Sequence, residues 1–322
     1  MSTNYSDAKI CVAGIGAIGT LMATMIGLKY SKNLCVLARN KRLEDIKKNG
    51  LILHSDFYGE KKAFPEKASD KGSDFGIQDY LLICVKNYAL DSIVKSIFPC
   101  VGEKTVIVPI MNGIEASSKL REIFPSAIVI DTVIYSSTKL NEDYSASQVG
   151  KFAHIFIGSK EKDEMHQNSA NNFWSLLKSV GFDSRFSKSI ESDIWQKFIH
   201  NCAFNSITAR YLYNSGQLRK DEKCLKDLKS IYSEGYNVAK ALGISMPEDY
   251  VEKKIIFTTT VQAESATSST KQDIDAWRKT EIDSLLGALI READKVKVDV
   301  KTIKDYYKYF MQKMNFIWGS KK

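Results

Sequence analysis

The stretch AKICVAGIGAIGTLMATMIG, residues 8–27, decides the fold of this 322-residue chain. An apolar run with β-branched residues leads into Gly14, Gly16 and Gly19, and a run at helical period follows. The order of strand, glycine turn and helix is typical of a dinucleotide-binding unit. Gly14 would permit the tight turn, Gly16 would leave space for a pyrophosphate, and Gly19 would let the helix pack closely on the strand. The alternative is a glycine-rich turn that binds no ligand.

The start of the predicted helix also supplies the electrostatics of such a site. Its unpaired N–H groups and the positive end of its dipole would face the phosphates. The residues that we expect to contact the cofactor in this turn are Gly14, Ile15, Gly16, Ala17, Ile18 and Gly19.

The first half of the chain continues with apolar runs separated by segments of helix length. These runs are NLCVLAR (33–39), DYLLICVK (79–86), KTVIVPIMNG (104–113) and SAIVIDTVIY (126–135). Short buried strands that alternate with helices predict a parallel sheet covered by helices. Two later runs are expected to be strands of an antiparallel extension, GKFAHIFIGS (150–159) and SRFSKSI (184–190).

The pattern changes near residue 190, and from there the sequence is almost entirely helical in pattern. Segments 223–244 and 270–295, for example, carry apolar residues at spacings of three and four. We therefore predict two domains, an α/β Rossmann-type dinucleotide-binding domain over residues 1–188 and an all-α domain over residues 189–322.

The composition is that of a globular chain, with 44% hydrophobic residues. No segment approaches the ~20 consecutive apolar residues of a transmembrane helix. The N-terminal MSTNYSDAK lacks the apolar core of a signal peptide. The 6 cysteines are scattered without a C-x-x-C pair, which predicts a reduced, cytoplasmic protein with neither disulfides nor a metal site.

The formal net charge of +8 is accompanied by a lysine-rich tail over residues 295–322. Such a tail could bind a nucleic acid or an acidic partner, or it could be the solvated face of a helix. Because no nucleic-acid motif accompanies the charge, we favour the solvated face and expect neither a nucleic acid nor a membrane as partner. The helical half could supply the interface of a homodimer.

The end of the second predicted strand indicates which dinucleotide would bind. Arg39 follows this strand, Lys41 and Arg42 come next, and the first acidic residue is Glu44. An NAD site usually has Asp or Glu here, which accepts hydrogen bonds from the ribose hydroxyls. A cationic end suits the 2′-phosphate of NADPH, which a carboxylate would repel. We expect NADPH, with Arg39 binding its 2′-phosphate; the alternative is an ordinary set of surface charges.

The stretch WQKFIHNCAFNSITA (195–209) places Lys197, Asn201 and Asn205 four residues apart, and so on one face of a helix. Hydride transfer to a ketone builds negative charge on the carbonyl oxygen, which a positioned ammonium can stabilise and protonate. Asparagine amides can hold a hydroxyl or carboxylate without adding charge. The alternative is a polar stripe that faces solvent. His200 lies one residue off this face, and we expect it to pack or to lie at the surface rather than to act as a base.

Five separated motifs make the chain resemble the ketopantoate reductase (2-dehydropantoate 2-reductase) family. They are GIGAIG (14–19), CVKNYAL (84–90), VPIMNGIE (108–115), KFIHNCAFNSITA (197–209) and SSTKQDIDAWRKTEID (268–283). The resemblance implies a Rossmann-type domain followed by an all-α domain like the C-terminal domain of 6-phosphogluconate dehydrogenase.

The resemblance also implies roles for the residues of the helical half. Lys197 corresponds to the family's general acid, and Asn201 and Asn205 correspond to its substrate-facing asparagines. Glu281 corresponds to the acid that binds the distal hydroxyl of the substrate and supports the lysine. A carboxylate near an ammonium favours its charged form, which opposes the effect of burial. The alternative is a purely structural salt bridge between Lys197 and Glu281.

Three further residues receive roles from the same resemblance. Ser269 corresponds to a serine that binds the substrate, although it could instead cap a helix. Asn112 corresponds to the residue near both the nicotinamide and the substrate, and Lys86 to a lysine on the cofactor side of the site.

The activity that the resemblance implies is the NADPH-dependent reduction of 2-dehydropantoate (ketopantoate) to (R)-pantoate, a step toward pantothenate and coenzyme A. The chain departs from the family at Met111, where glutamine is common, and at Leu286, where asparagine is common. The region IVIDTVIYSST (128–138) also lacks a glycine pair that is often present. These departures leave open a different 2-oxo acid as substrate, and a non-catalytic NADPH-sensing protein is a further alternative.

Overall fold

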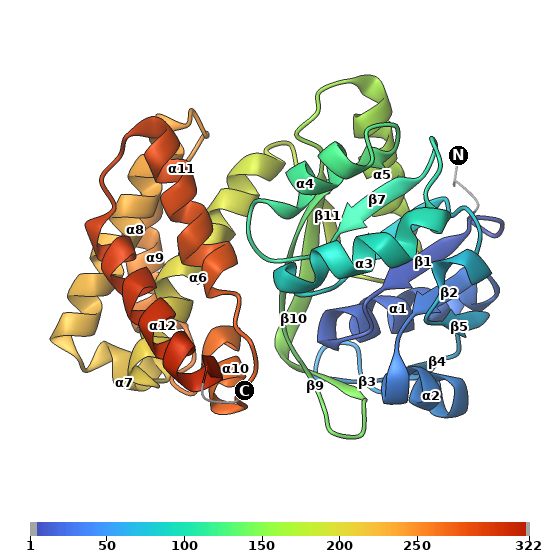
Figure 1. Cartoon of the computed structure of the whole chain (residues 1–322), viewed down its shortest axis with the longest axis horizontal. Coiled ribbons are helices and arrows are strands. Elements are labelled where there is room, and N and C mark those ends of the chain that lie inside the picture. The colour runs from blue at the N-terminus through green and yellow to red at the C-terminus, as the bar shows by residue number, and fades with distance from the viewer. Residues whose placement is uncertain (1–4, 320–322) are drawn as a thin grey trace. The chain divides into compact units, whose positions relative to one another are not determined.

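The computed structural model describes the backbone of residues 5–319 and the side chains of residues 5–313 (Figure 1). The chain divides into two compact units. The first consists of Met1–Asn112 and Ala116–Ile190, and the second of Gly113–Glu115 and Glu191–Lys322. The short segment 113–115 therefore belongs with the helices of the second unit, although it lies within the first half of the sequence.

The first unit contains the strands and the helices that cover them. Its strands are β1 (Ile10–Ala13), β2 (Leu34–Leu37), β3 (Leu51–Ser55), β4 (Lys61–Ala63), β5 (Lys67–Ser69), β6 (Tyr80–Ile83), β7 (Val106–Pro109), β8 (Ile128–Val129), β9 (Asp131–Leu140), β10 (Ala146–Gly158) and β11 (Ser184–Phe186). Its α-helices are α1 (Ala17–Tyr30), α2 (Asn40–Asn49), α3 (Leu90–Ile97), α4 (Ala116–Ile123) and α5 (Glu164–Ser179). Its single-turn helices are η1 (Ser31–Asn33), η2 (Gly72–Asp74), η3 (Asn87–Ala89) and η4 (Phe98–Cys100).

The predicted parallel sheet is confirmed. Its strand order over the described residues is β5-β2-β1-β6-β7-β8, and every pair in it is parallel. Successive residues of β1 serve opposite faces of the sheet, as the two-residue period of a strand requires. Ile10 and Val12 pack in the core that contains α1 and α5, whereas Cys11 and Ala13 pack in the core under α3 and α4. The chain order reverses between β1 and β6, and ligands of such folds bind at this switch point.

The expected antiparallel extension is only partly correct. A second sheet has the order β11-β10-β3-β4, with β9 also paired to β10. The β9–β10 pair is antiparallel, but β11 and β3 run parallel to β10. The predicted single strand 126–135 is wrong as well, because β8 ends the first sheet at Val129 and β9 begins the second at Asp131. The buried Asp131 carboxylate anchors this crossing, since it accepts bonds from the Arg121 guanidinium (2.7 Å) and the Lys160 N–H (2.8 Å).

The second unit is helical, as predicted. Its elements are α6 (Ile190–Tyr211), α7 (Ser215–Arg219), α8 (Glu222–Ala241), α9 (Tyr250–Ile256), η5 (Phe257–Val261), α10 (Ser269–Asp275), η6 (Asp283–Gly287), α11 (Ala288–Val296) and α12 (Lys301–Gly319). Within this unit α8 lies against α9, α11 and α12, which the orange and red ribbons of Figure 1 show.

The helical pattern over residues 270–295 does not form one helix. Helix α10 ends at Asp275, and Trp277 adopts the left-handed conformation with φ +54°. The backbone then folds back, because the Arg278 N–H donates to the Asp273 carbonyl over 2.7 Å. The helix resumes only beyond Glu281, which places this predicted site residue at the start of the η6–α11 segment.

Two further expectations can be compared with the described residues. Over residues 301–313 of the lysine-rich tail, Ile303 and Phe310 are buried whereas Lys304 and Lys308 are exposed, which fits the solvated face. The side chains of residues 314–322 lie outside the described residues. All cysteines are unpaired and buried. Among the helices of the described chain, none combines the length and apolar character needed to cross a membrane.

Candidate active site

The three glycines of the opening turn differ in why the structure has glycine at each position. Gly14 has φ +92°, a conformation that other residues rarely adopt. A Cβ on Gly19 would lie 2.0 Å from the Gly14 carbonyl oxygen, so this position must be glycine for α1 to pack against the turn. Gly16 precedes α1, and a Cβ there would meet no atom within 4 Å. The protein itself therefore does not require glycine at Gly16, and the space above it suits a phosphate at the helix N-terminus.

A pocket of about 210 Å³ lies beside this turn. It is lined by residues from the ends of β1, β2 and β6 and from α2, η3 and α3, namely Gly14, Ile15, Leu37, Ala38, Arg39, Arg42, Val85, Ala89, Ser92 and Ile93. The structure thus brings together Gly14, Ile15 and Arg39 of the predicted cofactor site. Ala17 and Ile18 are half-buried in the first turn of α1 and do not line this pocket.

Arg39 is exposed at the end of β2 and reaches across to α3. Its Nη1 donates to Ser92 Oγ over 3.2 Å, and its Nη2 donates to Ser96 Oγ over 2.7 Å. Neutral hydroxyl partners leave the positive charge of the guanidinium uncompensated within this set of contacts. The sequence did not indicate either serine, because both are ordinary polar residues of a short helix.

Arg42 has a structural role at the same turn. Its guanidinium donates to the Ile15 carbonyl (3.2 Å) and to Thr20 Oγ1 (2.8 Å), and it pairs with Asp45 (2.7 Å). These contacts fix the glycine turn to α2 and neutralise the charge of Arg42. Arg39 is therefore better suited than Arg42 to bind an anionic group.

Lys86 and Asn112 follow neighbouring strands of the parallel sheet, β6 and β7. Both side chains are half-buried. The residue next to Lys86 links the two loops, because Asn87 Nδ2 donates to the Asn112 carbonyl over 2.8 Å. The carboxyl ends of neighbouring parallel strands thus carry both predicted residues at one edge of the sheet.

In the helical unit, Lys197, Asn201 and Asn205 lie on one face of α6, but this face is not a solvent stripe. Lys197 and Asn201 are half-buried, and Asn205 is only 6% exposed. The neighbouring residues Phe198 and Cys202 belong to the core of the unit. These two amides and the ammonium are largely shielded from solvent. Such a row of polar groups can orient a small polar molecule.

Burial lowers the pKa of Lys197 from its ordinary 10.5 to about 8, and the charge of Glu281 opposes this shift. Glu281 is itself only 5% exposed. A lysine with a pKa near 8 is mostly protonated at neutral pH, yet it releases its proton far more readily than a surface lysine. The pair of Lys197 and Glu281 can therefore act as a proton donor supported by a carboxylate.

His200 packs against aromatic residues of the helical unit, which is one of its two expected placements. Its ring stacks on Phe204 and Tyr232, and its Nδ1 shares a hydrogen bond of 2.7 Å with the Tyr232 hydroxyl. Burial, with Lys254 and Lys197 nearby, lowers the pKa of His200 to about 3. The imidazole stays neutral at physiological pH and holds a tyrosine in place.

Ser269 is exposed at the first residue of α10 and is not the cap of that helix. The cap is Ser268, whose side chain accepts from the Lys271 N–H over 3.1 Å. Ser268 also accepts a hydrogen bond of 2.7 Å from Thr208, three residues beyond Asn205 on α6. The start of α10 is thereby tied to the turn of α6 that carries Asn205, while the Ser269 side chain is left available for a ligand.

The described part of the chain presents no candidate metal site. No group of three or more His, Cys, Asp or Glu side chains there has a suitable arrangement.

Two family models match the chain. Ketopantoate reductase PanE/ApbA matches residues 10–162, and ketopantoate reductase PanE/ApbA C terminal matches residues 189–313. The chain is also 27% identical over 302 residues to the 2-dehydropantoate 2-reductase of Mesorhizobium japonicum, an alignment that covers 87% of this chain and 90% of that protein.

Solved structures share the fold. A PanE/ApbA family ketopantoate reductase from Ralstonia eutropha JMP134 has a TM-score of 0.86 at 22% identity, with 96% of this chain and 99% of that chain covered. D-mandelate dehydrogenase, solved with NADH and anilino(oxo)acetate, has a TM-score of 0.83 at 20% identity, with the same coverage of 96% and 99%. The two family models follow each other along most of the sequence, and the chain therefore belongs to the ketopantoate reductase PanE/ApbA family of nicotinamide-dependent oxidoreductases.

Proposed function

We propose that this protein reduces 2-dehydropantoate to (R)-pantoate with NADPH. The observation that carries the proposal is the environment of Lys197, a withdrawn ammonium with a pKa of about 8 that is coupled to the buried Glu281. A reductase for a ketone needs such a group, because the carbonyl oxygen becomes negative as the hydride arrives.

In this proposal a bound nicotinamide dinucleotide supplies the hydride. Lys197 donates a proton to the carbonyl oxygen, and Glu281 accepts a hydrogen bond from the distal hydroxyl of the substrate and keeps Lys197 charged. Asn201 and Asn205 hold the substrate on the face of α6. Their amides can donate to a carboxylate without adding a second charge next to the acid.

Two further residues complete the proposed substrate contacts. Ser269, exposed at the start of α10, donates a hydrogen bond to the substrate. Asn112, at the end of β7, contacts both the substrate and the nicotinamide, and Lys86 lies on the cofactor side.

For the cofactor, the described residues fit a dinucleotide with a 2′-phosphate. The open space at Gly16 can receive the pyrophosphate, and the pocket bounded by Arg39 can receive the adenosine end. The Arg39 guanidinium donates to the neutral hydroxyls of Ser92 and Ser96, and it is the group that we propose to bind the 2′-phosphate. NADH is the alternative, since D-mandelate dehydrogenase was solved with it.

A second candidate is the reduction of another 2-oxo acid on the same scaffold. The likeness to D-mandelate dehydrogenase, with an anilino(oxo)acetate bound, supports this alternative. Of the departures from the family pattern, Leu286 is fully buried in the helical core, whereas Met111 is half-buried beside Asn112. Met111 is thus the departure that is placed to alter the substrate.

The test is an NADPH-oxidation assay with ketopantoate beside several other 2-oxo acids, repeated with NADH. The proposal predicts the highest kcat/KM for ketopantoate with NADPH. Preference for a 2-oxo acid that lacks the distal hydroxyl would favour the second candidate and count against the role of Glu281. Tight NADPH binding without consumption of any 2-oxo acid would favour the remaining alternative, a non-catalytic NADPH-sensing protein.

The matched pair of variants Lys197→Ala and Lys254→Met tests the acid. Lys254 is another half-buried lysine of the helical unit whose pKa burial lowers. Loss of a general acid costs on the order of a hundredfold or more, so Lys197→Ala should retain NADPH binding and lose most turnover. Lys254→Met should retain turnover. Equal losses of turnover in the two variants would contradict the proposed role of Lys197.

The homodimer and the cytoplasmic location remain predictions. Light scattering coupled to size-exclusion chromatography measures the first directly, because a monomer of 36.3 kDa and its dimer differ twofold in mass.

A further inference from the structure

The segment 113–115 leaves the first unit and packs with the helices. The chain passes out of the first unit after Asn112, contributes Gly113–Glu115 to the second unit, and returns at Ala116. Gly113 turns the chain with φ +90°. Ile114 packs against the core of the helical unit. The residue proposed to contact substrate and nicotinamide is thus directly followed by an anchored segment.

Glu115 fixes this segment to α11 through a two-point ion pair. Arg291 Nε donates to Glu115 Oε1 over 3.0 Å, and Arg291 Nη2 donates to Glu115 Oε2 over 3.1 Å. Such bidentate pairing constrains both position and orientation, which a single contact between point charges does not.

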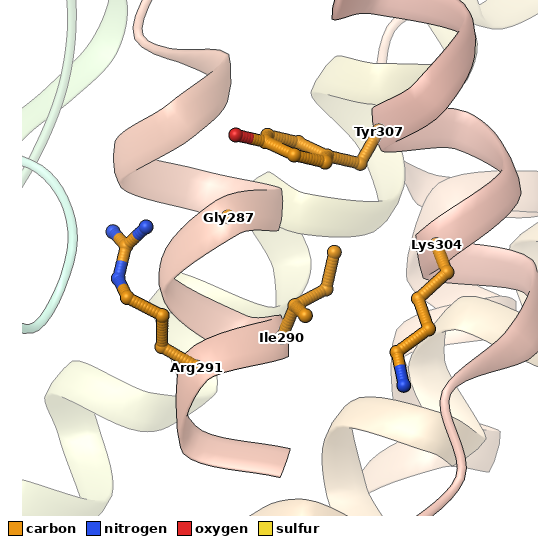
Figure 2. Close-up of a pocket in the computed structure, with 5 residues that line it drawn as sticks. All are labelled: Gly287, Ile290, Arg291, Lys304 and Tyr307. Atoms are coloured by element: carbon orange, nitrogen blue, oxygen red, sulfur yellow. The ribbon is translucent and has the colours of Figure 1, made fainter. Parts of the chain in front are cut away.

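Arg291 also contacts η6, the turn that follows Glu281. Its Nη2 donates to the Asp283 carbonyl (3.3 Å), and its Nη1 pairs with Asp283 Oδ1 (3.4 Å). The same carboxylate accepts a hydrogen bond of 2.6 Å from the Tyr307 hydroxyl on α12. In Figure 2, Arg291 and the Tyr307 hydroxyl point to the same side of α11, whereas the Lys304 ammonium points away from both.

The absence of a side chain at Gly287 leaves room for the contact between Asp283 and Arg291. A Cβ on Gly287 would lie 2.4 Å from Asp283 Oδ1 and 3.2 Å from Arg291 Nη1. Any side chain here would displace the Asp283 carboxylate from Arg291. The pocket of about 290 Å³ beside Gly287 does not offer Arg291 to an anion, because Arg291 already pairs with two carboxylates.

We infer that Glu115, Arg291, Asp283 and Tyr307 form a positioning network that holds the segments next to Asn112 and Glu281 in place. We call these four residues the Arg291 network. Glu115 lies three residues beyond Asn112, and Asp283 lies two residues beyond Glu281. The network contacts neither substrate nor cofactor; it acts through these two neighbours, and its importance for catalysis rests on the function proposed for them.

The first test is independent of activity. Hydrogen exchange is measured on the full chain for wild type, Arg291→Met and the control Lys295→Met, whose ion pair with Glu292 lies on the same helix. Hydrogen bonds to charged groups contribute enough that exchange in peptides spanning 112–116 and 281–287 should accelerate about tenfold in Arg291→Met alone. Acceleration confined to α11, or equal acceleration in Lys295→Met, would overturn the network.

The second test separates positioning from general destabilisation. With the best 2-oxo acid of the wild-type protein, Arg291→Met should raise KM for that acid or lower kcat by about tenfold, since small misplacements of reacting groups are costly. The KM for NADPH should rise less than the KM for the acid, because Asn112 is only one proposed contact of the dinucleotide and the pocket beside Arg39 is untouched. Glu115→Gln/Arg291→Met should be no worse than Arg291→Met alone if the pair acts as a unit. Additive losses, or equal losses in both KM values, would contradict the inference.

The variant Gly287→Ala gives an independent route to the same end, because it displaces Asp283 without removing any charge. It should accelerate exchange in the peptide spanning 281–287 and leave the peptide spanning 112–116 near its wild-type rate, because the pair of Glu115 and Arg291 stays intact. Wild-type exchange in 281–287 would count against the network. A wild-type protein that reduces no 2-oxo acid would defeat the proposed function, and the exchange measurements would still decide whether the network holds its two segments.

Discussion

The sequence places an ammonium at Lys197, and the packing around it sets the pKa of that ammonium. The four-residue spacing with Asn201 and Asn205 predicts a shared helix face from the sequence alone. The pKa of about 8 results from burial, opposed by a carboxylate that lies far away in the sequence, and neither effect is readable from local spacing. The shared helix face is therefore predictable from the sequence, but the protonation behaviour of the lysine is not.

The first prediction concerns Arg39 and the choice of dinucleotide. Hydrogen bonds to charged groups contribute roughly 1.5–3 kcal/mol, so Arg39→Ala should raise the Kd for NADPH by about tenfold or more. The Kd for NADH should change little, because NADH lacks the 2′-phosphate. Lys41→Ala, at an exposed neighbour, is the control. Equal weakening of both dinucleotides in Arg39→Ala would show that this side chain does not discriminate between them.

A second prediction at this scale concerns Trp277. A residue other than glycine in the left-handed region costs about 1–2 kcal/mol, and Trp277 is 63% exposed with φ +54°. Trp277→Gly should therefore increase the free energy of unfolding by up to about 1 kcal/mol, after the greater freedom of glycine in the unfolded chain is deducted. Trp277→Ala, which keeps the strained backbone, should give no gain.

Urea denaturation measures both variants. Destabilisation by Trp277→Gly would mean that contacts of the indole outweigh the backbone strain. A stabilised variant with a higher KM for the 2-oxo acid would indicate that the strained tryptophan is retained for the substrate, four residues before Glu281.

The elements that the sequence predicts best are those whose cause is local. The glycine turn between β1 and α1 was predictable because Gly14 and Gly19 each meet a steric demand, from within the turn or from the end of the neighbouring strand β6. The break between α10 and η6 was not, because the apolar spacing continues through it. Its cause is one left-handed residue, Trp277, and one hydrogen bond to the Asp273 carbonyl.

A third prediction follows from the two kinds of glycine in this turn. Gly19→Ala would put a Cβ 2.0 Å from the Gly14 carbonyl oxygen, so it should lower the melting temperature or prevent folding. Gly16→Ala meets no protein atom within 4 Å and should leave the melting temperature unchanged while weakening NADPH binding. Thermal denaturation with and without NADPH measures both effects. Normal NADPH binding in Gly16→Ala would show that no phosphate lies over this glycine.

At the scale of the whole molecule, contacts between distant segments are the part that the sequence could not supply. Glu115 and Arg291 are separated by 176 positions, and each is an ordinary charged residue in its local context. The α/β and helical halves were predictable from composition and period. The inclusion of residues 113–115 in the helical unit was not, because it depends on Ile114 packing against helices that come much later in the chain.

A fourth prediction concerns the stability of the whole fold and its dependence on pH. The folded pKa of Lys197 lies below its ordinary value, so the unfolded chain binds more protons between pH values of about 8 and 10.5. Below pH 8 the buried ammonium lowers the free energy of unfolding by its full amount. This destabilisation decreases as the pH rises through the window. Each pKa unit corresponds to about 1.4 kcal/mol, so Lys197→Met should be more stable than wild type at pH 7.

Urea denaturation of Lys197→Met and wild type at pH 7 and pH 10.5 checks this prediction. The difference in the free energy of unfolding should shrink at the higher pH. A difference that is independent of pH would mean that the ammonium is well solvated in the folded protein.

The central claim is that Lys197 is the acid, and the alkaline pH dependence of the reduction tests it most directly. With Lys197 as the acid, only the protonated lysine would be active, so kcat/KM for the 2-oxo acid should fall above pH 8, tenfold per pH unit. In Glu281→Gln the fall should begin at lower pH, because the carboxylate that raises the pKa of Lys197 is gone. A flat profile up to pH 10 in the wild type, or an unshifted one in Glu281→Gln, would contradict the account.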